Sequence, residues 1–220
     1  MWQEPFRDRF EGGQLLGPAV ADRLRGRSDV IVLALPRGGV PVGFEVARAL
    51  GAPLDVFIVR KLGVPGHEEL AMGAIASGGV RVLNDDVLRQ IPVSQQAIEA
   101  VARREQAELV RREASYRGSK PPLDVRGKTV VVVDDGLATG STMRAAVRAL
   151  RAMDAGSIVV AVPVAARETC EEFRAEVDDI VCLRTPEPFQ AVGLWYEDFT
   201  QTTDEEVHEL LAGAQQKVLQ

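Results

Sequence analysis

Residues Val130 to Met143 read VVVVDDGLATGSTM, and this stretch decides the fold. Its four consecutive valines predict a strand that is buried on both faces, as in a parallel sheet. Two carboxylates, Asp134 and Asp135, follow at the point where that strand ends. A turn of small residues then leads into a helix that we expect to begin near Ser141. Together these elements predict an anion site, because free backbone N–H groups and the positive end of the helix dipole point at one spot.

The turn suits a phosphate, and the two carboxylates suit a different part of the same ligand. Small side chains let a phosphate approach the backbone, and the hydroxyl side chains add donors. Adjacent carboxylates repel a phosphate and instead suit hydroxyl groups or a cation beside it. The sequence therefore predicts a sugar phosphate with neighbouring hydroxyl groups as ligand. We expect its phosphate to be bound by Gly136, Ala138, Thr139, Gly140, Ser141 and Thr142.

The order of hydrophobic run, acid pair and small-residue loop resembles the signature of type I phosphoribosyltransferases. Two commoner phosphate-binding loops, those of Walker-type NTPases and of dinucleotide-binding folds, are disfavoured, because the chain has neither G-x-x-x-x-G-K-[ST] nor a G-x-G-x-x-G after a strand. The alternative interpretation is an ordinary strand, turn and helix in which the acid pair is incidental. The resemblance implies an α/β fold with a mostly parallel central sheet flanked by helices.

An earlier segment has the same organisation. Residues 30–35 (VIVLAL) predict a buried strand, and a helix follows from about Val40 and ends at a glycine, position 51. Between the two lies Pro36-Arg37-Gly38-Gly39, which by itself indicates a tight turn. Combined with the acid-pair loop, it resembles the pyrophosphate loop of phosphoribosyltransferases. The resemblance implies that Arg37, Gly38 and Gly39 bind pyrophosphate, and that a peptide bond of this loop can be cis.

A third segment fits the same picture. Residues 54–60 (LDVFIVR) predict a strand, and residues 61–69 (KLGVPGHEE) predict a mobile lid, because two glycines and a proline fall within a short span. The resemblance implies that Lys61 helps to bind the pyrophosphate end of the ligand. His67 either faces the site or lies on the surface of a solvated loop, and its residue type favours the surface.

The rest of the chain continues the alternation of strands and helices. The first 28 residues are polar, with a short amphipathic segment at 17–24. We expect a hairpin over 71–83, a long charged helix over 94–115 with an apolar stripe that includes Val110, and a strand, a helix and a strand over 157–162, 167–175 and 179–183. One domain is expected over 1–220, with a core over 28–185, a helical insert over 85–118 and a small C-terminal hood over 186–220. The insert resembles a group of uncharacterised phosphoribosyltransferase-like proteins.

The aromatic residues of segment 192–199 (VGLWYEDF) have two interpretations. Flat rings suit stacking on a nitrogenous base, as the hood of phosphoribosyltransferases implies. Alternatively, the rings pin the C-terminal segment onto the core. The helix after them is predicted to begin with a capping box, with Thr203 as N-cap and Glu206 at the third helical position.

Composition limits the class of partner. The chain has 220 residues, 46% of them hydrophobic and 26% charged, and a net charge of −6, which disfavours nucleic acid as a partner. The two cysteines, Cys170 and Cys182, have no metal-ligand spacing and predict two free thiols in a reducing cytoplasm. The N-terminal residues predict no signal peptide, and no apolar run is long enough to predict a membrane span.

The resemblance implies a glycosyltransferase of nucleotide metabolism. Its donor would be 5-phosphoribosyl-1-pyrophosphate (PRPP), with Mg²⁺ bound mainly through the donor, and its acceptor a nucleobase or another nucleophile. Arg37, Asp134 and Asp135 would be the catalytic residues, and a homodimer is compatible with the family. Two alternatives remain open: a non-catalytic regulator that binds PRPP or a nucleotide, and an RNA-binding attenuation regulator on the same fold.

Overall fold

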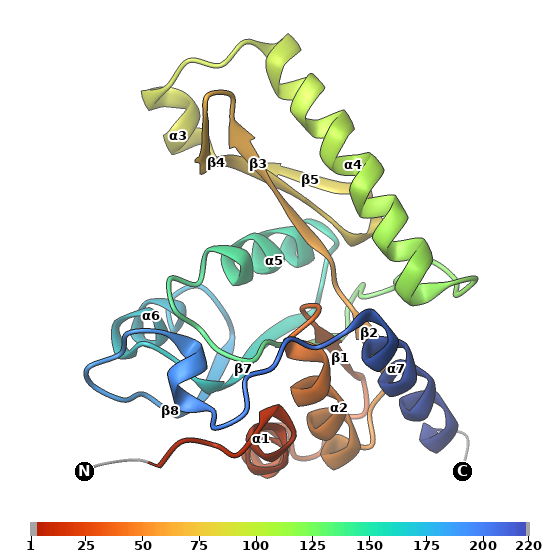
Figure 1. The fold of residues 1–220 in the computed structure, drawn as a ribbon. Coiled ribbons are helices and arrows are strands. Elements are labelled where there is room, and N and C mark those ends of the chain that lie inside the picture. The colour runs from red at the N-terminus through yellow and green to blue at the C-terminus, as the bar shows by residue number, and fades with distance from the viewer. Residues whose placement is uncertain (1–3, 219–220) are drawn as a thin grey trace.

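A parallel sheet forms the centre of the computed structural model, which describes residues 4–218 (Figure 1). Within these residues the sheet has five strands in the order β2-β1-β6-β7-β8, and every neighbouring pair is parallel. Its strands are β1 (Val30–Ala34), β2 (Leu54–Val56), β6 (Thr129–Val133), β7 (Ser157–Val164) and β8 (Asp179–Arg184). All five residues of β6 are buried, as its valine run predicts. The α/β fold expected from the sequence is therefore confirmed.

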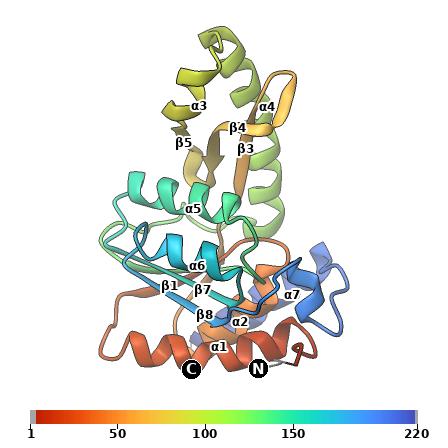
Figure 2. The ribbon, with the colours of Figure 1, turned by 90° about the vertical axis from the view of Figure 1, so that its left-hand side faces the viewer.

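Helices cover both faces of this sheet. On one face lie α1 (Arg9–Arg23), α2 (Gly39–Leu50) and α7 (Asp204–Val218). On the other lie α5 (Ser141–Ala152) and α6 (Arg167–Phe173). Figures 1 and 2 show the two layers from perpendicular directions. The predicted starts of α2 and α5 are confirmed to within a residue, and Gly51 ends α2 in the left-handed conformation (φ 60°) as expected.

The first helix is longer than the sequence predicted. It begins at Arg9 rather than near Gly17, and it packs closely on α2. A Cβ atom on Gly13 would lie 2.8 Å from the carbonyl oxygen of Val42, and one on Gly17 would lie 2.6 Å from the Cβ of Ala49. These contacts explain the miss, because glycines that weaken an isolated helix here allow two helices to approach.

A second, antiparallel sheet stands on the far side of α5 (Figure 1). Its strands, in the order β3-β4-β5, are β3 (Val59–Val64), β4 (His67–Ala76) and β5 (Val80–Leu83), and the 3₁₀ turn η1 (Ser77–Gly79) joins β4 to β5. The hairpin expected over 71–83 is confirmed. Helices α3 (Asp85–Gln90) and α4 (Gln95–Arg117) follow this sheet, and Ser94 caps α4 by accepting a hydrogen bond from the Ala97 N–H at 3.2 Å.

Three expectations for this part of the chain are wrong. The strand expected over 54–60 is divided, because the backbone leaves the central sheet at Phe57, which donates to Ala34, and Ser77 then donates to the carbonyl of Ile58. The lid expected over 61–69 belongs to strands β3 and β4, with the turn at Pro65 and Gly66. Val110 is 50% exposed and lies outside the buried stripe of α4.

The C-terminal segment folds back over the loops of the central sheet. The 3₁₀ turn η2 (Val192–Trp195) precedes Tyr196, which pairs with Phe6 in an isolated bridge. Thr203 Oγ1 accepts a hydrogen bond from the Glu206 N–H at 3.1 Å, so the predicted N-cap of α7 is confirmed. None of the helices within residues 4–218 combines the length and apolar character needed to cross a membrane.

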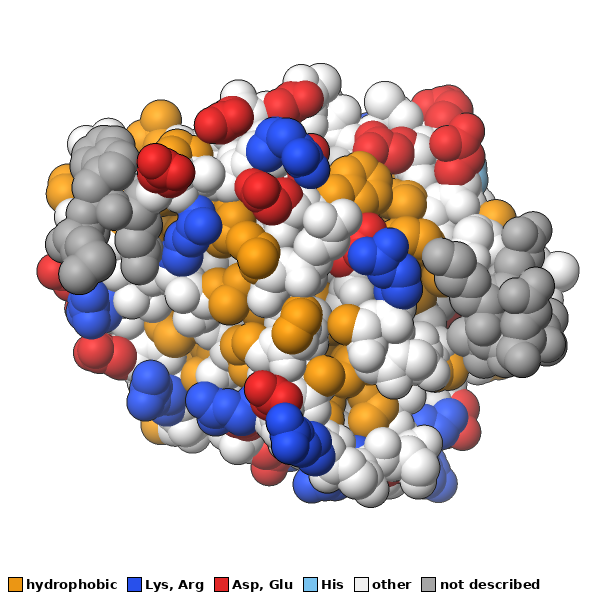
Figure 3. Space-filling model, turned by 90° about the horizontal axis from the view of Figure 1, so that it is seen from below, with side chains coloured by type: hydrophobic (Ala, Val, Ile, Leu, Met, Phe, Trp, Pro, Cys, Tyr) orange, Lys and Arg blue, Asp and Glu red, His pale blue; other side chains and the backbone are white. Residues whose placement is uncertain are grey.

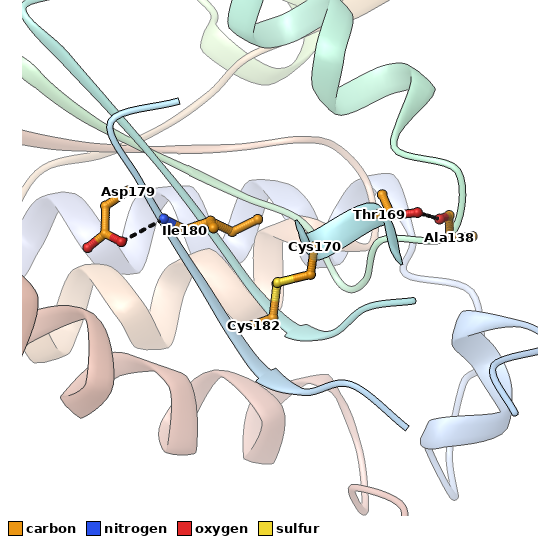
Figure 4. Close-up of a disulfide and its surroundings, with 6 residues drawn as sticks. All are labelled: Ala138, Thr169, Cys170, Asp179, Ile180 and Cys182. Carbon is orange, nitrogen blue, oxygen red and sulfur yellow. Dashed lines mark hydrogen bonds between the residues drawn. A yellow bond between two sulfur atoms is a disulfide. The ribbon is translucent and has the colours of Figure 1, made fainter. Parts of the chain in front are cut away.

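The cysteines are joined, which corrects the expectation of two free thiols. Cys170 on α6 and Cys182 on β8 form a disulfide with their Cα atoms 6.7 Å apart (Figure 4). No pattern in the sequence indicates this pairing, because the contact arises only when α6 packs beside β8. The cytoplasmic location that was inferred from free thiols stays a prediction without that support.

Candidate functional site

The two predicted loops lie side by side at the carboxyl end of the central sheet. Strands β1 and β6 are in register, with Ala34 opposite Val133, so the loops that follow them start at the same edge. The Leu35 N–H donates to the carbonyl of Val133 at 2.9 Å. A Cβ atom on Gly39 would lie 2.7 Å from that same carbonyl oxygen. Gly39 is therefore required because backbone packs directly on backbone here. The peptide bond between Pro36 and Arg37 in the same loop is cis.

The acid pair presents one unused oxygen from each carboxylate. Oδ1 of Asp134 accepts a hydrogen bond from the Asp135 N–H at 2.8 Å. Oδ2 of Asp135 accepts from Nε of Arg9, also at 2.8 Å. No residue within 4–218 donates a side-chain or backbone hydrogen bond to the remaining oxygens, Oδ2 of Asp134 and Oδ1 of Asp135. Two adjacent acceptors at a strand end are the arrangement that a pair of neighbouring hydroxyl groups requires.

Burial controls the charge of both acids. Burial raises the pKa of Asp134 well above its ordinary 3.8, and the charge of Asp135 raises it further. Burial also raises the pKa of Asp135, while the hydrogen bond and positive charge of Arg9 oppose that rise. The two carboxylates therefore titrate as a pair whose charge depends on the single arginine beside it.

The phosphate loop is exposed and its amides are unpaired. Ala138, Thr139, Ser141 and Thr142 are exposed, and α5 begins at Ser141 without a side-chain cap. In the described part of the chain, no hydrogen bond involves the N–H groups of residues 138–142, whereas the Leu137 N–H donates to Val164 at 2.9 Å. Free N–H groups at the start of a twelve-residue helix are the donors that an anion needs.

Helix α6 and Arg144 hold the loop from behind. Oγ1 of Thr169 donates to the carbonyl oxygen of Ala138 at 2.6 Å (Figure 4), and Nη1 of Arg144 donates to that of Thr139 at 2.8 Å. A Cβ atom on Gly140 would lie 2.5 Å from the ring of Phe173. The carbonyl oxygens of Ala138 and Thr139 are thus bound by protein side chains, whereas the N–H groups of the loop stay free.

Arg37 and Lys61 have different neighbours: Arg37 lies beside the start of α7, and Lys61 lies near the start of α5. Nη1 of Arg37 lies 3.7 Å from Oδ1 of Asp204 at the start of α7, and Asp204 also accepts a hydrogen bond from the Tyr116 hydroxyl at 2.5 Å. Lys61 lies on β3 and lines a cleft of about 190 Å³ together with Ser141 of α5. That cleft also has Arg144, Arg148 and Asn84 in its walls, and His67, Glu68 and Glu69 are exposed outside it.

The aromatic residues of the C-terminal segment support the acid pair. The Tyr196 hydroxyl donates to the backbone carbonyl of Asp135 at 2.6 Å, and burial raises the pKa of Tyr196. Its ring lies 5.3 Å from that of Phe199 and 5.5 Å from that of Phe6. With only 5% of its surface exposed, Tyr196 pins the segment onto the core, the second of the two interpretations considered above.

Sequence reasoning missed Arg9 as part of this site, whereas Tyr196 and Phe199 belong to the aromatic segment considered for base stacking or for packing on the core. Arg9 is separated from Asp135 by 126 residues, and it lies in a segment with no motif. A lone arginine near a chain terminus resembles any surface arginine, so no local signal could have found it.

Residues 14–197, which include both loops of the site, match the family model of the phosphoribosyl transferase domain. The chain belongs to this family. It is 49% identical over 202 residues to a Mycobacterium tuberculosis (strain H37Rv) protein with the name "Putative phosphoribosyl transferase", covering 92% of this chain and 45% of that one. The chain therefore spans about half the length of this phosphoribosyl transferase relative.

Two further proteins are similar to this chain. The crystal structure of TT1426 from Thermus thermophilus matches with a TM-score of 0.85 and 44% identity, covering 95% of this chain and 98% of that one. A "Bifunctional protein PyrR" from Chloroflexus aurantiacus is 35% identical over 123 residues, which cover 52% of this chain and 58% of that protein.

Proposed function

We propose that the protein is a phosphoribosyltransferase that uses PRPP as donor, transfers the phosphoribosyl group to a nucleobase or another nucleophile, and releases pyrophosphate. One observation carries the proposal: the acid pair, with one unpaired oxygen on each carboxylate, directly precedes a loop of free N–H groups and packs against the loop that bears Arg37. PRPP has hydroxyl groups between a phosphate and a pyrophosphate, in the same order.

Each group of the donor would have its own set of residues. The N–H groups of residues 138–142 and the hydroxyl groups of Thr139, Ser141 and Thr142 would bind the 5-phosphate. The free oxygens of Asp134 and Asp135 would accept hydrogen bonds from the ribose hydroxyl groups. Arg37 and the backbone at Gly38 and Gly39 would hold the pyrophosphate.

The reaction needs stabilisation of charge and no protein nucleophile. The bond between the anomeric carbon and the pyrophosphate oxygen breaks, and its electron pair leaves with pyrophosphate. The acceptor then bonds to the anomeric carbon and loses its proton. The negative charge of Asp134 and Asp135 would favour the positive charge that develops on the ribose, and Arg37 would stabilise the leaving group.

Magnesium would come with the donor. In the part of the chain that the structure describes, no three His, Cys, Asp or Glu side chains gather closely enough to hold a metal ion alone. The pyrophosphate and hydroxyl oxygens of PRPP are the hard ligands that Mg²⁺ prefers, so we propose that the donor supplies them. The ion would neutralise pyrophosphate charge as it forms.

The experiment that tests the function measures PRPP binding first and turnover second. Calorimetry with PRPP and Mg²⁺ should show binding by the wild-type protein, and Asp134→Asn with Asp135→Asn should abolish it while the fold is kept. A screen of bases and amines, following pyrophosphate release, then identifies the acceptor. Absence of PRPP binding by the wild-type protein would refute the proposal.

A PRPP- or nucleotide-binding regulator is the second candidate. The contacts of Arg9 with Asp135 and of Arg37 with Asp204 favour it, because in both a residue of the site is engaged by another segment of the chain. Binding of PRPP without pyrophosphate release from any acceptor would support this regulator. An RNA-binding regulator has less support, since acidic and basic side chains are mixed on the face seen from the side of α1 (Figure 3). A homodimer stays a prediction.

A further inference from the structure

The partner of the acid pair is Arg9, the first residue of α1. Its side chain is 10% exposed and that of Asp135 is 16% exposed. An ion pair on the open surface contributes little because water screens it and both side chains move. This pair is largely removed from water, so the position of Arg9 constrains the position of the carboxylate.

The fold fixes where Arg9 lies. Asp8 caps α1, since its side chain accepts a hydrogen bond from the Glu11 N–H at 2.8 Å. The close approach at Gly13 and Gly17 then holds α1 against α2. Helix α2 begins at Gly39, directly after the Arg37 loop. Arg9 therefore lies on a helix that packs against α2, the helix that directly follows the proposed pyrophosphate loop.

The guanidinium group of Arg9 has three partners on three sides. Nε donates to Oδ2 of Asp135, and Nη1 donates to the backbone carbonyl of Thr200 at 2.8 Å. The guanidinium carbon lies 3.9 Å from the centre of the Phe199 ring. Arginine suits this position because its planar fork can donate in two directions while it stacks on a ring, which a lysine ammonium cannot do.

The position of Asp135 is constrained from a second side. A Cβ atom on Gly38 would lie 2.1 Å from Oδ2 of Asp135, so this oxygen lies against the backbone of the Arg37 loop. With Oδ2 held by Arg9 and enclosed by Gly38, the direction of Oδ1 is set as well. Oδ1 is the oxygen that the proposed function assigns to a ribose hydroxyl group.

We propose that Arg9 is the positioning residue of the acid pair: it holds Asp135 so that the free oxygen of this carboxylate meets a ribose hydroxyl group. The inference rests on the proposed function. Arg9 does not touch the ligand in this role, and the contacts with Phe199 and Thr200 connect its position to the C-terminal segment.

The test compares two ligands that differ only in the hydroxyl groups. Calorimetry measures the affinity of each variant for ribose 5-phosphate and for 2,3-dideoxyribose 5-phosphate. The wild-type protein should prefer ribose 5-phosphate by about tenfold or more, because a hydrogen bond to a charged group discriminates on this scale. Arg9→Gln should lose most of this preference and keep its affinity for the dideoxy compound. Arg9→Lys should recover part of the preference.

Arg25→Gln is the matched control. Arg25 follows α1 and is 80% exposed, and its partner is Asp22, so this variant loses the same charge far from the acid pair. It should retain the wild-type preference. A purely structural role of Arg9 would lower both affinities equally and leave their ratio unchanged.

The outcomes distinguish a failure of the proposed function from a failure of this inference alone. Wild-type protein that binds neither compound would overturn the proposed function and this inference together. A preference for ribose 5-phosphate that survives in Arg9→Gln would overturn the inference alone. Tighter binding of ribose 5-phosphate by that variant than by the wild-type protein would do the same. Thermal unfolding monitors the fold. If Arg9→Gln does not fold, Arg9→Lys decides, because it keeps the charge and loses the planar fork. A full wild-type preference in Arg9→Lys would then overturn the inference.

Discussion

Gly38→Ala tests the site through one methyl group. Gly38 has φ −59° and ψ −32°, a conformation that alanine adopts without strain, so the backbone itself accepts the change. The new Cβ atom would lie 2.1 Å from Oδ2 of Asp135 and 2.8 Å from its Cγ. The contact with Oδ2 is about 1.3 Å shorter than an ordinary contact of 3.4 Å, so the carboxylate must move. It can move only by weakening its hydrogen bond with Arg9.

The expected cost follows from this overlap. Overpacking of a closely packed site costs about 1–3 kcal/mol of unfolding free energy. For a chain of this length each kcal/mol lowers Tm by about 2–4 °C. Ligand binding should suffer further, because the displaced carboxylate no longer presents Oδ1 to the ribose. Thermal unfolding measures the first effect, and calorimetry with PRPP and Mg²⁺ measures the second.

Two matched variants make this prediction specific. Gly213→Ala places a Cβ atom 3.7 Å from the ring of Phe44, an ordinary contact in the interior of α7, and should leave both measurements near wild type or raise Tm slightly. Asp135→Ala removes the atoms that clash, so Gly38→Ala should cost clearly less stability in that background than in wild type. Wild-type stability and affinity in Gly38→Ala would refute the reasoning.

Four further predictions concern other parts of the site. Arg37→Ala should weaken binding of PRPP and pyrophosphate far more than that of a nucleoside 5-monophosphate, since only the first two carry the leaving group; equal losses in calorimetry would show that Arg37 only supports its loop. Burial, reinforced by the charge of Asp135, raises the pKa of Asp134 well above its unfolded value of 3.8. Between these two pKa values the folded protein holds a proton that the unfolded chain has released, so wild-type stability falls as the pH rises from 3.8 to the folded pKa. Asp134→Asn should therefore flatten the pH dependence of Tm and raise Tm at pH 7, and a slope equal to that of wild type would contradict the assignment. Thr169→Val removes one hydrogen bond to the phosphate loop and should lower the free energy of unfolding by about 1 kcal/mol; it should also weaken binding of ribose 5-phosphate, and unchanged affinity would separate α6 from the site. Reduction of the Cys170–Cys182 disulfide should lower the free energy of unfolding by about 3 kcal/mol, as denaturant titration with and without a dithiol will measure, whereas coincident curves would show that the bond does not constrain the unfolded chain.

The loops of the site were predictable because their information is local. A run of β-branched valines followed by a small-residue turn favours a buried strand, and the acids and small residues that follow it then lie at the strand end. The same reasoning placed Gly38 and Gly39, whose lack of side chains the structure explains by contacts with Asp135 and the Val133 carbonyl. Predictions failed where a segment changes partners, as at Phe57, since hydrophobic residues on both sides of the break look like one strand.

The sequence by itself determined the fold class, the two loops and the chemistry that each can offer, because these depend on residues that are neighbours in the chain. Only the tertiary structure decided how that chemistry is held. It brought Arg9 to Asp135 across 126 residues, placed Tyr196 beneath the acid pair, and joined Cys170 to Cys182. The physical reason is that these contacts follow from the packing of α1, the C-terminal segment and α6 against the sheet, and packing between distant segments leaves no periodic or local pattern in the chain.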